Sequence, residues 1–304
     1  MTVEVEITAS LVKTLRERTG VGMMECKKAL VAANGDLEHA IEDLRKIGQA
    51  KAVKKGDRIA AEGIVAAKVA ADNRYAVIVE VNCETDFVAR EEKFKHFANL
   101  VAEVALAENI TDVAALTQSK VPGSDKTVEE TRLNLVAQLG ENIALRRMHA
   151  LRVETGMVAA YLHGGAGVAR IGALVAIDTD RSDVAKDLAM QIAAMKPECI
   201  DAAAIEPARL EKEKEILLVQ AREANQGKPE EILNKILSGM ITKFIREITL
   251  VGQASIKDPK QTIEQLLQAA KTKVTGMMRF EVGEGIEKQA DNFVAEVMSQ
   301  VRNS

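Results

Sequence analysis

The stretch Val79–Arg90 reads Val-Glu-Val-Asn-Cys-Glu-Thr-Asp-Phe-Val-Ala-Arg, and its pattern changes from that of a strand to that of a helix. Its first residues continue an alternation of apolar side chains, which predicts a β-strand over Tyr75–Cys83. Beyond it, apolar residues recur at helical spacing: Phe94, Phe97, Val101 and Val104. Thr85–Val88 therefore forms a strand-to-helix turn, a place where a rigid scaffold can present side chains.

The pair Asp86 and Phe87 on this turn has two interpretations. Asp is favoured at helix N-caps, so Asp86 can begin the helix while Phe87 packs into the core. Alternatively, the aromatic side chain is exposed and contacts a partner. The residues of the turn by themselves favour neither interpretation.

An internal repeat bears on this choice. Gly156–Ala160 echoes Gly63–Ala67, and each copy continues with a second strand, a Thr-Asp pair and a helix. After that pair, the second copy has Arg181 where the first has Phe87. A shared scaffold explains the Thr-Asp pair but not the aromatic residue, so we expect Phe87 to have a role beyond packing.

Residues 1–56 predict a compact unit of short helices separated by glycine-bearing turns. Thr8 and Asp36 are placed to cap the first and the third helix, which end near Gly20 and Gly48. Such a unit resembles a ubiquitin-associated-type three-helix bundle. A small helical domain without a binding role is the alternative.

Met23 and Met24 begin the second of these helices, just after a glycine-rich turn. Methionine suits adaptable contact surfaces, but both side chains can equally fill the core of the small bundle. The residues that follow the bundle, 52–57, are largely polar and basic, and this composition predicts a linker.

Pro207–Ala224 and Lys228–Ile248 predict two long helices joined by a short polar turn. They are interpreted as a projecting antiparallel hairpin, although an ordinary pair of packed helices has the same pattern. Their apolar residues exceed what one seam between two helices needs, so we expect the hairpin to contribute to self-association. A terminal amphipathic helix is predicted over residues 291–301.

These patterns predict an α+β multidomain protein with a duplicated core of antiparallel strands. Its predicted parts are a three-helix domain and linker at 1–56, core subdomains at 57–140 and 141–285, a helical hairpin within the second at about 205–248, and a C-terminal helical module at 286–304.

Composition argues against several classes of partner. The formal net charge is -4 and aromatic residues make up 3%, which disfavours a nucleic-acid surface or a base-stacking platform. No apolar run is long enough to span a bilayer, and the acidic N-terminus has no signal-peptide core, so we expect a cytoplasmic protein without membrane contact. Metal-ligand spacing is absent among the cysteines, which are Cys26, Cys83 and Cys199.

Catalytic signatures are also missing. The chain has no P-loop, no Gly-x-Ser-x-Gly elbow and no His-Glu-x-x-His helix. His163 precedes a glycine-rich loop, but Arg170 stands where a dinucleotide fingerprint needs its third glycine. We therefore expect no catalytic residue, no cofactor and no metal, and recognition as the chemistry of this protein.

Several segments resemble the elongation factor Ts family. They occur in the family's order over nearly the whole chain: Leu15–Gly20, Met23–Leu30, Glu80–Ala89, Gly140–Ile143 and Arg279–Gly285. The loop from His163 to Arg170 is longer than the His-Gly-Ala-Arg-Ile-Gly segment of short-loop members.

The resemblance implies a guanine nucleotide exchange factor that binds elongation factor Tu, both GDP-bound and nucleotide-free. It implies that one turn disturbs the magnesium site of that GTPase, through Thr85, Asp86, Phe87 and Val88. It implies further partner contacts at Met23, Met24 and His163, and a possible homodimer through the helical hairpin.

Other readings of the sequence remain open. An enzyme requires a pocket with converging polar groups. A ubiquitin-type adapter rests on the N-terminal unit alone. A structural oligomer built on the helical hairpin leaves Phe87 unexplained.

Overall fold

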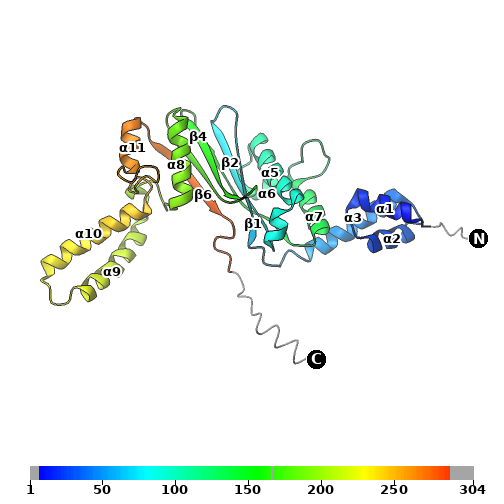
Figure 1. Cartoon of the computed structure of the whole chain (residues 1–304), viewed down its shortest axis with the longest axis horizontal. Coiled ribbons are helices and arrows are strands. Elements are labelled where there is room, and N and C mark those ends of the chain that lie inside the picture. Colours follow the sequence, from blue (N-terminus) through cyan, green and yellow to red (C-terminus); the bar gives the residue numbers. More distant parts are fainter. Residues whose placement is uncertain (1–6, 166, 288–304) are drawn as a thin grey trace, which may run out of the picture.

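The computed structural model describes residues 7–165 and 167–287, and within them the strands form two three-stranded antiparallel sheets (Figure 1). The first sheet has, in spatial order, β1 (Glu62–Val69), β2 (Tyr75–Cys83) and β3 (Ile143–Arg152). The second has, in the same way, β4 (Met157–Gly165), β5 (Val168–Ile177) and β6 (Val274–Glu281). Each sheet is thus a hairpin whose second strand also pairs with a strand that returns after intervening helices.

Strand β3 was missed by the sequence reasoning, and it lies beyond the boundary predicted between residues 140 and 141. It pairs with β2, so the first sheet takes its third strand from the second predicted subdomain. Adjacent Arg146 and Arg147 interrupt the apolar alternation of this strand, and the pairing shifts register between Glu80 and Val81. Both features hide the strand from a period-two search.

The inner faces of the two sheets pack against each other. Val65 and Ile78 of the first sheet share a buried cluster with Leu174 and Phe280 of the second. Gly172 sits where the sheets come closest, because a Cβ atom there would lie 2.5 Å from the Val65 side chain. The glycine therefore permits the close approach of the two layers.

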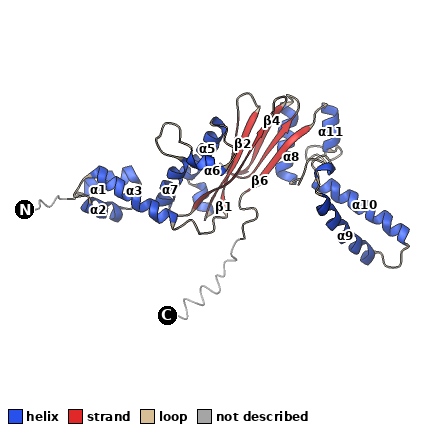
Figure 2. Ribbon diagram, turned by 180° about the vertical axis from the view of Figure 1, so that it is seen from behind, coloured by secondary structure: helices blue, strands red, loops and turns tan. Residues whose placement is uncertain are grey.

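Helices cover the outer face of each sheet. The first is covered by α5 (Glu92–Ala107) and α7 (Val128–Leu139), and the second by α8 (Ser182–Met195) and α11 (Ile263–Ala270). Figure 2 shows α5 and α7 toward one end of the molecule, the strands in the middle, and α11 toward the other end. Shorter elements are α4 (Asp86–Arg90), α6 (Val113–Gln118) and the 3-10 turn Ala202–Ala204.

The N-terminal helices are α1 (Ala9–Thr19), α2 (Met23–Ala32) and α3 (Leu37–Val53). The predicted caps are confirmed, since the side chains of Thr8 and Asp36 accept backbone hydrogen bonds from Leu11 and His39. These helices pack around an apolar cluster of their own, which is distinct from the clusters of the sheets.

The predicted end of α3 near Gly48 is wrong, and of the linker predicted at 52–57 the first two residues still belong to the helix. The helix continues to Val53 and lies against α7. A Cβ atom on Gly48 would be 3.0 Å from the Ala137 Cβ, so the glycine lets the two helices touch rather than ending one of them. Ala52 is buried in the core of the first sheet.

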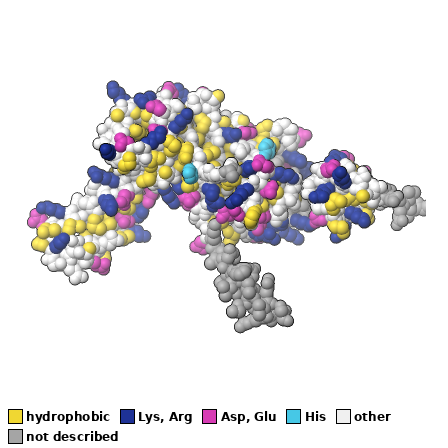
Figure 3. Space-filling view, in the orientation of Figure 1, with side chains coloured by type: hydrophobic (Ala, Val, Ile, Leu, Met, Phe, Trp, Pro, Cys, Tyr) yellow, Lys and Arg dark blue, Asp and Glu magenta, His cyan; other side chains and the backbone are white. Residues whose placement is uncertain are grey.

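At the opposite end of the molecule, α9 (Pro207–Ala224) and α10 (Glu230–Ile248) lie side by side and project from the body (Figure 1). Figure 3 shows a band of hydrophobic side chains along this helix pair. The exposed large apolar residues there are Ile216, Val219 and Ile232. The helix predicted at 291–301 lies outside the described residues.

A buried carboxylate closes one end of the interface between the sheets. Glu80 on β2 is fully buried and accepts a hydrogen bond from Arg147 Nε at 2.5 Å. Arg146, Asn82 and the backbone N–H of Gly283 also donate to its oxygens, at 3.1, 3.0 and 2.8 Å. The carboxylate therefore ties β2 to β3 and to the chain just after β6.

We predict that Glu80→Ala lowers the free energy of unfolding by about 3 kcal/mol, because it removes the fully buried carboxylate that pairs with the partly buried Arg146 and Arg147 and leaves their donors toward it unsatisfied. Urea unfolding followed by circular dichroism measures this change. Glu103→Ala is the matched control, because Glu103 pairs with Lys68 at 2.7 Å on the exposed outer surface. Glu103→Ala is expected to lower the free energy of unfolding by no more than about 1 kcal/mol. Equal losses of stability in the two variants would contradict the role given to Glu80.

Candidate functional site

The turn after β2 is capped by Thr85 rather than by Asp86. The Thr85 hydroxyl accepts a hydrogen bond from the Val88 N–H at 3.4 Å, and α4 begins at Asp86. Asp86 instead forms an ion pair with Arg90 at 2.9 Å, one helical turn further on. The interpretation of Asp86 as the helix cap is therefore wrong.

The structure places Phe87 on the surface. Its side chain is 77% exposed, whereas Val88 and Ala89 are buried in the core of the first sheet at 7% and 1%. The first turn of α4 is thus anchored by the two residues that follow Phe87, while Phe87 itself faces solvent. Packing of Phe87 into the core is excluded.

Three polar contacts hold the segment that precedes α4. Glu141 accepts hydrogen bonds from the Thr85 backbone N–H at 2.9 Å and from its hydroxyl at 2.6 Å. Glu84 accepts one from the Asn142 N–H at 2.6 Å. The turn is therefore attached to the residues just ahead of β3.

Cys83 ends β2 beneath this turn, and its thiol donates a hydrogen bond to the Thr85 carbonyl oxygen at 3.2 Å. Burial raises the pKa of this thiol well above its usual value, and the nearby carboxylates of Glu141 and Glu62 raise it further. The group stays a protonated thiol at neutral pH, which suits a packing residue and not a nucleophile.

Met23 and Met24 are both exposed, at 45% and 68%. The core of the N-terminal helices is filled by other residues, among them Leu15, Cys26 and Leu30. The alternative in which both methionines fill that core is excluded. Their side chains form an exposed apolar pair at the beginning of α2.

His163 lies near the end of β4, where it is exposed. Its ring stacks on Tyr161 with 6.2 Å between centroids, and its Nδ1 atom is 3.3 Å from the Tyr161 hydroxyl oxygen. The pairing of β4 with β5 shifts register directly after it. Tyr161, which holds the imidazole, had not been singled out in the sequence.

Parts of the chain that are far apart in sequence meet around the beginning of α5. A Cβ atom on Gly20, in the turn before α2, would lie 3.6 Å from Lys93 Nζ. One on Gly167, in the β4–β5 turn, would lie 3.9 Å from Lys95 Nζ. The turn before α2 and the β4–β5 turn therefore both approach the beginning of α5, which directly follows α4.

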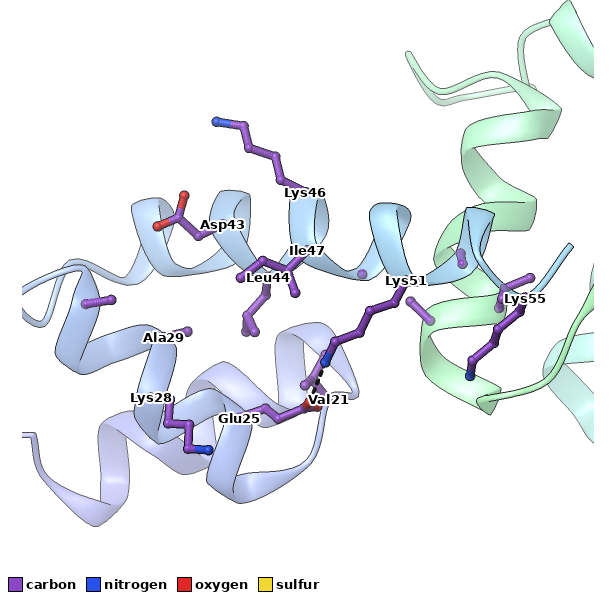
Figure 4. Close-up of a pocket in the computed structure, with 15 residues that line it drawn as sticks. Val21, Glu25, Lys28, Ala29, Asp43, Leu44, Lys46, Ile47, Lys51 and Lys55 are labelled. Atoms are coloured by element: carbon purple, nitrogen blue, oxygen red, sulfur yellow. Dashed lines mark hydrogen bonds and ion pairs between the residues drawn. The ribbon is translucent and has the colours of Figure 1, made fainter.

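A groove between α2, α3 and α7 was not foreseen from the sequence (Figure 4). It has a volume of about 510 Å³ and a floor that includes Ala29, Leu44 and Ile47. Four lysine side chains line the groove: Lys28, Lys46, Lys51 and Lys55. Of these, Lys51 forms an ion pair with Glu25 at 2.9 Å. An apolar floor with ammonium groups at its rim suits contact with another chain. The signal for it was the spacing of lysines along α3.

Neither a metal-binding cluster nor a membrane-spanning helix occurs in the described part of the chain. Residues 7–165 and 167–287 contain no group of three or more His, Cys, Asp or Glu side chains placed to hold a metal ion. Over the same residues, no helix is both long and apolar enough to cross a bilayer.

Comparison with known proteins identifies the family. The family model described as elongation factor TS matches residues 84–284, from the turn before α4 to the segment after β6. Elongation factor Ts of Legionella pneumophila strain Philadelphia 1 is 50% identical over 299 residues, which cover 97% of this chain and 99% of that protein. This chain belongs to the elongation factor Ts family.

Other members of the elongation factor Ts family are similar over the same length. The protein of Thioalkalivibrio sulfidiphilus is 50% identical, and that of Coxiella burnetii strain Dugway is 46% identical, each over 98% of this chain and 99% of its own. Full-length similarity includes the N-terminal helices, which lie outside the family-model match.

Because Phe87 is exposed and its neighbour Val88 is buried, substitutions at the two positions should differ in their effect on stability. Phe87→Ala should change the free energy of unfolding by less than about 1 kcal/mol, because the side chain gains little from folding. Val88→Ala should cost about 2 kcal/mol through lost burial and a residual cavity. Chemical denaturation of both variants measures these changes. A large loss of unfolding free energy for Phe87→Ala would show that Phe87 is a core residue.

Proposed function

We propose that this protein is a guanine nucleotide exchange factor that binds GDP-bound elongation factor Tu, disturbs its magnesium and phosphate site, and promotes GDP release during translation elongation. Membership of the elongation factor Ts family supports the role. The observation that carries the mechanism is Phe87, a large apolar side chain held 77% exposed on an anchored turn.

Exchange of this kind needs binding energy and no catalytic group. The factor must bind the nucleotide-free partner more tightly than the GDP-bound one, and each tenfold loss of GDP affinity requires about 1.4 kcal/mol of coupling. Transfer of a phenylalanine side chain from water into a partner's pocket supplies about 2 to 3 kcal/mol. Burial of Phe87 is thus large enough to supply much of a tenfold to hundredfold loss of GDP affinity, and too small to account for exchange alone.

Asp86 is proposed to act beside it. The carboxylate is partly exposed and its ion pair with Arg90 lies at the surface, so separating the pair costs little. Asp86 can therefore leave Arg90 and compete for, or repel, the groups that organise the partner's magnesium ion. Thr85 and Val88 hold the turn from either side, one by hydrogen bonding and one by burial.

Met23, Met24 and His163 are proposed as further contacts with the same partner. Support comes from the turn before α2 and the β4–β5 turn, which both approach the beginning of α5, so we expect one bound GTPase to touch these residues together with the Thr85–Val88 turn. Self-association through α9 and α10 stays a prediction, which rests on the exposed apolar side chains of that helix pair.

We predict that Phe87→Ala slows factor-stimulated GDP release by about tenfold or more, because the lost apolar contact is made as the nucleotide site opens. Release of fluorescent GDP from elongation factor Tu measures it. Arg181→Ala is the matched control, since Arg181 occupies the corresponding place in the second copy, and its rate should equal that of the wild type. A normal rate for Phe87→Ala would remove the turn as the site of action.

For the bundle, we predict an effect on affinity. Replacing Met23 and Met24 together by Ala should raise the half-saturating concentration of the factor by about tenfold, equivalent to about 1.4 kcal/mol, and leave the maximal release rate unchanged. Val31→Ala, an exposed apolar residue on the same helix, serves as the control and should change neither quantity. A fall in the maximal rate alone would assign the methionines to the exchange step instead.

A further inference from the structure

We propose that Glu141 is a positioning residue for Phe87: its carboxylate fixes the Thr85 turn so that the aromatic side chain is held ready for the partner. This inference rests on the proposed exchange function and extends it to a residue whose hydrogen bonds go to Thr85 within the chain.

The two oxygens of Glu141 hold two different groups of one residue. One accepts the Thr85 backbone N–H at 2.9 Å, and the other accepts the Thr85 hydroxyl at 2.6 Å. The short second distance is typical of a hydroxyl that donates to a charged carboxylate. Both the backbone and the side chain of Thr85 are therefore fixed relative to the segment ahead of β3.

The direction of the hydroxyl proton links this contact to α4. An ionised carboxylate is an acceptor only, so it obliges the Thr85 hydroxyl to donate its hydrogen toward Glu141. The oxygen lone pairs are then left for the Val88 N–H, the cap of α4. Phe87 lies between the capping residue and buried Val88, so the contact with Glu141 sets the starting point of the turn that carries it.

The second copy of the repeat contains the same clamp in a different form. Thr179 donates its hydroxyl hydrogen bond to Thr272 at 2.7 Å, and Thr272 stands two residues before β6 as Glu141 stands two residues before β3. The acidic residue before each threonine also has an equivalent partner. Asp178 accepts the Lys273 N–H at 2.7 Å, as Glu84 accepts that of Asn142.

The two clamps differ where the two turns differ. In the second copy a hydroxyl group takes the place of the carboxylate, the turn carries Arg181, and α8 begins there without a side-chain cap. In the first copy the carboxylate holds both groups of Thr85, α4 is capped, and the exposed Phe87 follows. The stronger, two-point clamp thus occurs at the turn that presents the aromatic residue.

A double-mutant cycle separates positioning from general stabilisation. GDP release from elongation factor Tu is measured at saturating factor for the wild type, Glu141→Ala, Phe87→Ala and the double variant, together with the melting temperature of each. Glu141→Ala should lower the maximal rate by about fivefold, equivalent to about 1 kcal/mol. In the Phe87→Ala background, the same change should have almost no further effect, because there is no aromatic side chain left to position.

Two further variants control the cycle. Thr272→Val removes the equivalent hydrogen bond from the second copy and should lower the melting temperature without changing the exchange rate. Glu141→Gln keeps one acceptor oxygen and should recover part of the rate. If Glu141→Ala does not fold, Glu141→Gln takes its place in the cycle, with a smaller expected loss.

The outcomes distinguish the two proposals. If the wild type does not accelerate GDP release, the proposed function fails, whatever the variants do. If the wild type is active and the loss from Glu141→Ala is the same with and without Phe87, or is absent, the positioning role of Glu141 is overturned. An equal loss of exchange in Thr272→Val would also overturn it, because general destabilisation would then explain the effect.

Discussion

The burial of both faces of β2 is the constraint on which the rest of this structure depends. One face meets α5, and the other meets the second sheet, so every residue of the strand is buried. A carboxylate in such a place is tolerated only when charged donors surround it. Glu80 finds those donors on β3 and after β6, and this requirement joins three segments that are distant in the chain.

The buried strand β2 fixes one side of the candidate site. The strand leads directly into Thr85, so the turn begins from a fixed point, and Val88 and Ala89 fasten its other side to the same core. Between these anchors, Phe87 is exposed on a turn whose backbone is held on both sides. An aromatic side chain that is already in place loses little conformational freedom on binding, and this raises the share of its burial energy that is available to the partner.

The repeat shows how one scaffold serves two purposes. Both copies place a Thr-Asp turn after the central strand and fasten it to the residues ahead of the third strand. In the second copy the turn leads into α8 and contributes to the fold. In the first, a short capped helix is inserted before α5, and its first turn carries the exposed aromatic residue. The proposed exchange function thus depends on α4 and Phe87, which the first copy of the repeat has and the second lacks.

Local signals in the sequence predicted most elements of this fold. The limits of β2 and α9, the caps Thr8 and Asp36, and the repeat of strands and turns all follow from periodicity and from residues with strong positional preferences. The exposure of Phe87 was also accessible, because comparison of the two copies showed that the scaffold does not need an aromatic residue there.

Other features depend on contacts between distant segments and were decided by the tertiary structure. Gly48 looked like a helix end, but it lies inside α3 because α7 requires a close approach at that point. Strand β3 was hidden by the adjacent charges of Arg146 and Arg147. Their place in a strand is explained by Glu80 on β2, whose carboxylate accepts hydrogen bonds from both. Sequence alone therefore determined most of the helices and strands, though not β3 or the end of α3, and it determined which turn carries Phe87. Only the fold decided how that turn is held, because Glu141 lies 56 residues away from Thr85 and no local pattern connects them.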